Sequence, residues 1–217
     1  MPANESLSIT RQSHPMRDPY LYEDVPVLKN LLNLKDADHL EQAEADITAF
    51  NFSNVDGIVQ SLAFDLSRLL AIHKHIFGDI YEWAGEIRTI PMTKGERVLG
   101  GDTVRYSQPA DIERDCLAVL RKLAETDWPS FGVRETASVF AKLIAALWQT
   151  HPFREGNTRT VITFAAQFAE VHGFRMDKTL LKDSAAYVRD ALVKASDGQY
   201  SEYDYLVKII EDAIRRG

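Results

Sequence analysis

Two helical patterns of apolar residues meet at a short polar segment, residues 151–159, and this junction constrains the fold most. Pro152 disfavours helical geometry at the residue before it, so the first helix is expected to end near His151. Gly156 permits a tight turn, and Asn157 is expected to cap the next helix through its side chain. The apolar residues of the first helix recur at steps of three or four and are Ala137, Phe140, Ile144 and Leu147.

The rest of the chain is largely helical by the same criterion, and no repeat or linker divides it. Gly78 is the expected end of one helix, and Ser107 is expected to cap another, with Pro109 in its first turn. The predicted helices are 36–50 (with Leu40, Ala43, Ile47 and Phe50 on one stripe), 56–77, 111–126, 133–150, 157–172, about 182–195, and a last one from after Ser201 to Arg216.

Residues 86–106 break this pattern. They hold β-branched residues, Pro91 and the pair Gly100-Gly101, which favour a hairpin with an exposed edge. The predicted fold class is therefore mostly α, with one small β-hairpin. Residues 1–19 are expected to form a loosely ordered arm, and residues 20–217 a single domain.

Bulk properties exclude several classes of protein. The net charge of −7 and pI near 5.4 argue against a nucleic-acid partner. Cys116 is the only cysteine, so an internal disulfide and a cysteine-rich metal site are excluded. No signal peptide precedes Tyr20 and no apolar run approaches the roughly 20 residues of a membrane helix, so a cytoplasmic location without membrane contact is expected.

The junction combines groups that handle phosphates. The amides of Gly156, Asn157 and Thr158 would lie at a helix N-terminus, where unpaired donors and the helix dipole favour an anion. Arg159 offers a planar fork to phosphate oxygens, and Glu155 offers oxygens to a metal ion.

His151 supplies a general base beside these groups, and apolar Phe153 is expected to anchor the loop in the core. Each residue alone has an ordinary structural explanation as a cap, a solvated charge or a turn residue. Together, a base, a metal ligand and an anion site are what nucleotidyl or phosphoryl transfer requires.

The run His151-x-Phe153-x-Glu155-Gly156-Asn157-x-Arg159 resembles the signature of the Fic (filamentation induced by cAMP) family, and residues 76–88 are similar to the segment before that family's flap. The resemblance implies a helical Fic fold and transfer of AMP from ATP to a Ser, Thr or Tyr hydroxyl of a target protein. It further implies the role of each motif residue: His151 as general base, Glu155 as ligand of Mg²⁺, Gly156, Asn157 and Thr158 as the anion hole, and Arg159 as a phosphate ligand.

In this family the hairpin would be the flap on which the target chain docks as an added strand, with Thr93, Lys94 and Gly95 as the expected contacts. Two positions depart from the family pattern: Ile162 stands where a second arginine is usual, and Thr158 where glycine is usual. Arg154 or Lys94 is a candidate substitute for that arginine.

The inhibitory motif of the family is absent, which favours restraint by a small separate partner, as in the family's toxin–antitoxin branch; other members are effectors delivered into host cells. Three hypotheses remain: a protein adenylyltransferase, a Fic-fold enzyme that moves a different phosphate-containing group, and a helical interaction module with a degenerate site.

Overall fold

The computed structural model describes residues 18–58 and 63–217, and these are mostly helical, as predicted. Strands are absent from this part of the chain; one isolated antiparallel bridge joins Leu21 and Leu28. The α-helices are α1 (Ala37–Phe52), α2 (Val55–Ile58), α3 (Leu66–Phe77), α4 (Ile112–Glu125), α5 (Val133–Thr150), α6 (Asn157–Val171), α7 (Lys178–Asp183), α8 (Ala185–Ala195) and α9 (Asp204–Arg216).

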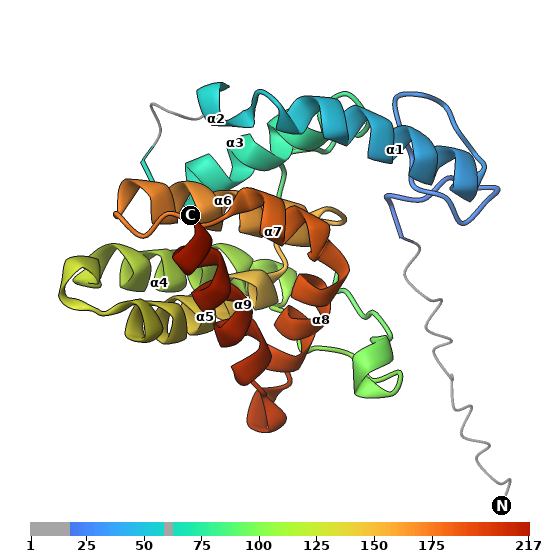
Figure 1. Ribbon diagram of the computed structural model, residues 1–217. Helices are drawn as coiled ribbons and strands as arrows, with labels where there is room; N and C mark the ends of the chain where they lie inside the picture. The colour runs from blue at the N-terminus through green and yellow to red at the C-terminus, as the bar shows by residue number, and fades with distance from the viewer. Residues whose placement is uncertain (1–17, 59–62) are drawn as a thin grey trace, which may run out of the picture.

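Helix α5 is the centre of the bundle. It packs against α4, α6, α8 and α9, and Figure 1 shows these helices gathered in the body of the molecule. The predicted stripe is confirmed, because Ala137, Phe140, Ile144 and Leu147 are all buried. The apolar face of α5 therefore holds the helix in place and fixes where its C-terminal end lies.

Helix α3 packs against α6, and α1 packs against α3; Figure 1 shows both helices above α6 in this view. The predicted helix 56–77 is instead two helices, because Asp65 accepts a hydrogen bond from the Arg68 amide and caps α3 there. Residues 59–62 of that prediction lie outside the described residues. The predicted end at Gly78 is confirmed, whereas Phe50 of the α1 stripe is 71% exposed and does not belong to the core.

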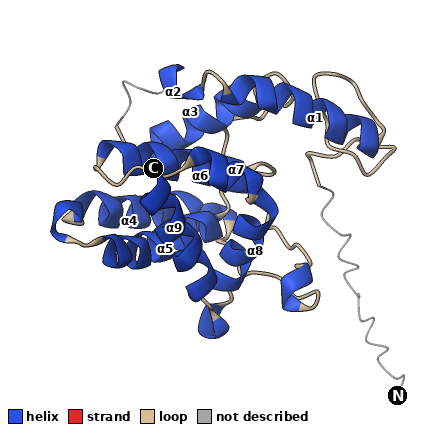
Figure 2. Ribbon diagram, viewed as in Figure 1, coloured by secondary structure: helices blue, strands red, loops and turns tan. Residues whose placement is uncertain are grey.

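The predicted β-hairpin is wrong as secondary structure. Residues 89–106, called the flap loop below, form an extended loop with one short 3-10 turn, Arg97–Leu99, and Figure 2 shows no strand there. Two backbone bonds join its two arms, from the Glu96 amide to the Asp102 carbonyl at 2.8 Å and from the Gly101 amide to the Glu96 carbonyl at 3.0 Å. Pro91 has no amide hydrogen to donate, and the Lys94 amide bonds to the Thr103 hydroxyl instead of to a backbone carbonyl, so no ladder forms.

Of two smaller predictions, one is wrong and the other lies largely outside the described residues. Ser107 does not cap α4: its hydroxyl donates to Asp115 at 2.7 Å, and a 3-10 turn, Pro109–Asp111, precedes the helix. Residues 1–17 of the predicted N-terminal arm lie outside the described residues. Within residues 18–58 and 63–217, no helix has the length and apolarity needed to span a bilayer.

Candidate functional site

The motif loop, residues 151–159, turns sharply at two positions with positive φ. His151 follows the last residue of α5 and has φ 48° and ψ 59°, a conformation that non-glycine residues rarely adopt. Gly156 has φ 79°, and a Cβ atom there would lie 2.3 Å from the Phe77 ring. The loop therefore requires glycine at position 156 both for its backbone angle and for its approach to α3.

Asn157 fastens the loop to itself rather than capping α6, so that prediction is wrong. Its side-chain oxygen accepts from the Phe153 amide at 2.9 Å, and its side-chain nitrogen donates to the Phe153 carbonyl at 2.8 Å. Gly156 occupies the N-cap position and makes no side-chain cap. Since the first amides of a helix have no intrahelical acceptor, the α6 N-terminus keeps donors available for an anion.

Phe153 is fully buried and stacks on the His73 ring, with centroids 3.8 Å apart. The His73 Nδ1 accepts from the Gly85 amide at 2.8 Å, so its Nε2 carries the hydrogen and donates to the Glu155 carbonyl at 3.0 Å. Burial lowers the pKa of His73 to about 3. The neutral His73 of α3 thus holds the motif loop in two ways: it stacks on the Phe153 ring and donates to the Glu155 carbonyl.

His151 lies at the bottom of the site. It is 3% exposed, its ring stacks on Tyr106 with centroids 4.0 Å apart, and neither ring nitrogen has a hydrogen-bond partner among the described residues. Its carbonyl accepts from the buried Arg88 Nε at 2.7 Å. Burial, followed by the charges of Lys94 and Arg88, holds the pKa of His151 well below its usual value, so the ring is neutral at neutral pH.

Glu155 is the carboxylate of the site. Its Oε1 accepts from the Gly156 amide at 2.9 Å, and its Oε2 lies 3.3 Å from the Lys94 ammonium. Burial acts to raise the pKa of Glu155, but the Lys94 charge and the Gly156 amide outweigh it and keep the pKa below its usual value. Glu155 is therefore ionised at neutral pH.

The three predicted flap contacts, Thr93, Lys94 and Gly95, differ in what they bond. Lys94 directs its side chain to Glu155, whereas Thr93 and Gly95 make no backbone hydrogen bond within the described part of the chain. Arg154, the other candidate substitute for the missing arginine, bonds Asp18 at 2.7 and 3.1 Å instead.

Thr158 and Arg159 lie in the first turn of α6. The Arg159 guanidinium pairs with Glu44 of α1 at 2.5 Å and lies over the Phe77 ring, 4.6 Å from its centroid. The Thr158 hydroxyl accepts from the Trp148 indole at 2.9 Å, so its own hydrogen can be donated elsewhere.

These groups surround a polar cavity of about 310 Å³. Three cationic side chains, Lys94, Arg159 and Arg189, line it around the Glu155 carboxylate and the His151 imidazole. Its remaining lining comes from Trp148, Gly156, Asn157, Thr158, Ala185 and Ala186.

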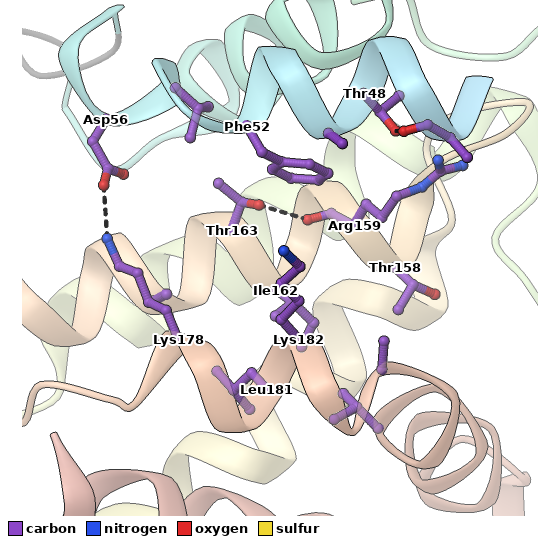
Figure 3. Close-up of a pocket in the computed structure, with 16 residues that line it drawn as sticks. Thr48, Phe52, Asp56, Thr158, Arg159, Ile162, Thr163, Lys178, Leu181 and Lys182 are labelled. Carbon is purple, nitrogen blue, oxygen red and sulfur yellow. Dashed lines mark hydrogen bonds and ion pairs between the residues drawn. The ribbon is translucent and has the colours of Figure 1, made fainter. Parts of the chain in front are cut away.

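An apolar cavity of about 540 Å³ adjoins the polar cavity and shares Thr158, Arg159 and Ala185 with it. It lies between α1, α6 and α7, and Figure 3 shows Phe52 and Ile162 directed into it. Position 162 therefore contributes an apolar wall to this space, and no charge.

Several residues of the site were not predicted. His73, Arg88, Tyr106 and Arg189 lie far along the chain from the motif, on other helices or on the segment between α3 and α4. Glu44 gave no signal in the sequence beyond being one of several acids on α1. Their roles depend on packing that local spacing does not report.

Comparison with known proteins agrees with this geometry. The model of the Fic/DOC family matches residues 63–169. A probable protein adenylyltransferase, y4lH of Sinorhizobium fredii, is 30% identical over 84% of this chain and 90% of its own length. The protein adenylyltransferase VbhT of Bartonella schoenbuchensis is 31% identical over 77% of this chain, which spans 34% of VbhT.

Solved structures share the fold. The N-terminal Fic domain of a VirB-translocated effector from Bartonella quintana, solved with bound ADP, superposes with a TM-score of 0.74 at 25% identity. The match covers 89% of this chain and 93% of that one. The protein described here belongs to the Fic/DOC family.

Proposed function

We propose that this chain transfers AMP from ATP to a Ser, Thr or Tyr hydroxyl of a target protein, with residues 20–217 acting as one Fic domain in the cytoplasm. It is a nucleotidyltransferase enzyme, the class to which protein adenylyltransferases such as its relatives belong. The observation that carries the proposal is the polar cavity, where a helix N-terminus, a carboxylate and a neutral imidazole meet among three cations.

His151 would act as the base. In the reaction the target oxygen bonds to the α-phosphorus, the bond from that phosphorus to the bridging oxygen breaks, and pyrophosphate leaves. The hydroxyl proton goes to an imidazole nitrogen, which is available because His151 is neutral and unpartnered within the described residues.

The flap loop must shift for this transfer to occur. Both ring nitrogens of His151 are covered, and the ring packs under Tyr106, which belongs to the flap loop. Two backbone bonds join the arms of this loop, and its buried Glu96 pairs with Arg189 of α8, so a shift that uncovers His151 needs to move Tyr106 without breaking that pair.

Glu155 would hold the Mg²⁺ of the Mg²⁺–ATP complex. It is ionised, its Oε2 already faces a cation, and it is the one carboxylate that lines the polar cavity in the described part of the chain. This donor set fits Mg²⁺, which commonly binds one or two carboxylates and completes its shell with phosphates and water. When bound, the ion would neutralise phosphate charge.

The anion hole would consist of the first α6 amides, at Asn157 and Thr158, and of the Thr158 hydroxyl. The Gly156 amide donates to Glu155 here, so its role is to orient the carboxylate. Arg159 can serve the phosphates only by leaving Glu44 or by sharing its guanidinium.

The target chain would dock on the flap loop. Extended residues with unpaired amides, such as Thr93 and Gly95 within the described part, accept an added strand through main-chain bonds. This docking would bring a hydroxyl of the target over the polar cavity.

Two finer proposals follow from the apolar cavity. A small separate protein that restrains the enzyme would bind beside Arg159, where this cavity is lined by α1 and α7. Because Ile162 adds no charge there, a donor other than ATP, carrying a different phosphate-containing group, is the second candidate activity.

Transfer of label to protein tests the proposal. ATP labelled at the α-phosphate should label a target protein in wild type and not in the His151→Ala variant, while ATP labelled at the γ-phosphate should not. Label from the γ-phosphate, or from another nucleotide donor alone, would favour the second candidate. Absence of nucleotide binding would favour the third hypothesis, a helical interaction module with a degenerate site.

A further inference from the structure

Lys94 lies in the catalytic cavity although it belongs to the flap loop. Its ammonium is 3.3 Å from Glu155 Oε2, and its side chain is 27% exposed, against 34% for Glu155. The Lys94 amide donates to the Thr103 hydroxyl at 3.1 Å, which fixes the backbone from which the side chain descends.

Every oxygen of Glu155 is engaged in this arrangement. Oε1 accepts from the Gly156 amide, Oε2 faces Lys94, and the backbone carbonyl accepts from His73. Oε1 is held by an amide of the motif loop itself, so Oε2 is the oxygen that we expect to bind a metal ion. Lys94 occupies that position.

We propose that Lys94 is a resident counter-cation that keeps a divalent metal ion off Glu155 until a nucleotide enters the cavity. This inference rests on the proposed function, because it takes metal and nucleotide to share the polar cavity. Metal binding then depends on nucleotide binding, although no contact between lysine and metal is involved.

Charge and geometry support this role. A single carboxylate already paired with an ammonium group attracts a free divalent ion weakly. The ion and the ammonium would both lie next to the same oxygen, and their positive charges repel each other. A nucleotide brings phosphate oxygens that accept the ammonium, and the flexible four-carbon stem of lysine allows it to move to them. Oε2 is then free at the moment when phosphates are present to complete the metal's shell.

Arg159 and Arg189 are less suited to this role. Arg159 pairs with Glu44, and Arg189 pairs with the buried Glu96 at 2.8 Å. Lys94 is the cation of the cavity lining whose partner is the proposed metal ligand itself.

Binding of Mn²⁺, a spectroscopic substitute for Mg²⁺, tests the inference without measuring activity. Electron paramagnetic resonance counts free Mn²⁺ with and without ATP in wild type, Lys94→Met, Lys94→Arg and Lys122→Met. Lys122 is an exposed lysine of α4, so its replacement changes the net charge equally, away from the cavity.

We expect Lys94→Met to bind Mn²⁺ without nucleotide about tenfold more tightly than wild type, which corresponds to about 1.4 kcal/mol. The gain in Mn²⁺ affinity on adding ATP should shrink by the same factor. Lys94→Arg and Lys122→Met should behave as wild type, and Glu155→Gln should lose the site in either background.

The outcomes separate two failures. If Lys94→Met folds, as its thermal melting shows, and binds Mn²⁺ alone no better than wild type, then Lys94 is not a barrier to the metal and the inference is overturned. If wild type binds neither ATP nor Mn²⁺ with ATP, the proposed function fails, and the inference fails with it.

Discussion

The motif loop and the flap loop both face the polar cavity, but they are held in different ways. The motif loop is over-determined: Gly156 touches Phe77, Asn157 bonds Phe153 twice, and His73 holds the Glu155 carbonyl. The flap loop has two backbone bonds between its arms, both at Glu96, whose side chain pairs with Arg189, and a Cβ added at Gly100 at its tip would meet nothing within 4 Å. The catalytic groups therefore lie on a loop held throughout its length, while access to them depends on a loop that is anchored at Glu96 and Tyr106 and open at its tip.

Replacing His151 by Ala should have the largest effect if the motif loop carries the chemistry. We expect a loss of label transfer of about 10²–10⁴-fold, the usual contribution of a general base. Nucleotide affinity, measured by calorimetry, should change little, because the α6 amides remain. Thr93→Ala on the flap loop, which keeps the backbone that docks the target, serves as the matched control. Equal losses from the two variants would contradict the division of roles.

The two loops should also differ in tolerance of a methyl group. Gly156→Ala should destabilise the protein by about 3 kcal/mol or more, since the new Cβ would overlap the Phe77 ring at a positive φ. Gly100→Ala, with φ 67° and open space, should cost only about 1 kcal/mol. Urea unfolding measures both, and similar midpoints for the two variants would show that the motif loop is not rigid.

Low pH should weaken the motif loop through His73. Because its folded pKa of about 3 lies below the usual 6.5, the unfolded chain takes up the proton first as the pH falls. This contribution to stability is complete above pH 6.5 and is lost progressively toward pH 3, by roughly 2 kcal/mol between pH 6.5 and pH 5. The flap loop holds no histidine, so it makes no contribution of this kind.

Urea unfolding at several pH values checks that expectation, with His73→Gln as the comparison. The variant should be less stable at neutral pH but should lose less stability on acidification. Parallel curves for the two proteins would mean that His73 does not remain neutral in the folded state.

Thr158→Val should have the smallest effect. It removes the hydroxyl offered to the phosphates and leaves the Trp148 indole without its acceptor, at nearly constant volume. We expect label transfer to fall about tenfold and stability by about 1 kcal/mol. Kinetic constants from label transfer would place the loss in kcat if the hydroxyl acts on the transition state, and unchanged activity would exclude the hydroxyl from the anion hole.

The positions of most helices could be read from the sequence, because a stripe of apolar residues at helical spacing is a local signal. The burial of Phe140 and Leu147 was predicted in this way, and the end of α5 near His151 was predicted from Pro152. The flap was not, because β-branched residues and paired glycines also suit an extended loop, and only pairing between arms distinguishes the two. The split of the predicted helix 56–77 depended on the cap at Asp65, which the periodicity hides.

For the site, the sequence alone determined which chemical groups lie on one short segment, from His151 to Arg159, since neighbours in the chain remain neighbours in space. Only the tertiary structure decided what surrounds them. Lys94 pairs with Glu155, Glu44 pairs with Arg159, and the Tyr106 ring stacks on His151. These contacts join residues far apart in the chain, and their formation depends on how the bundle packs, which no local pattern of residues encodes.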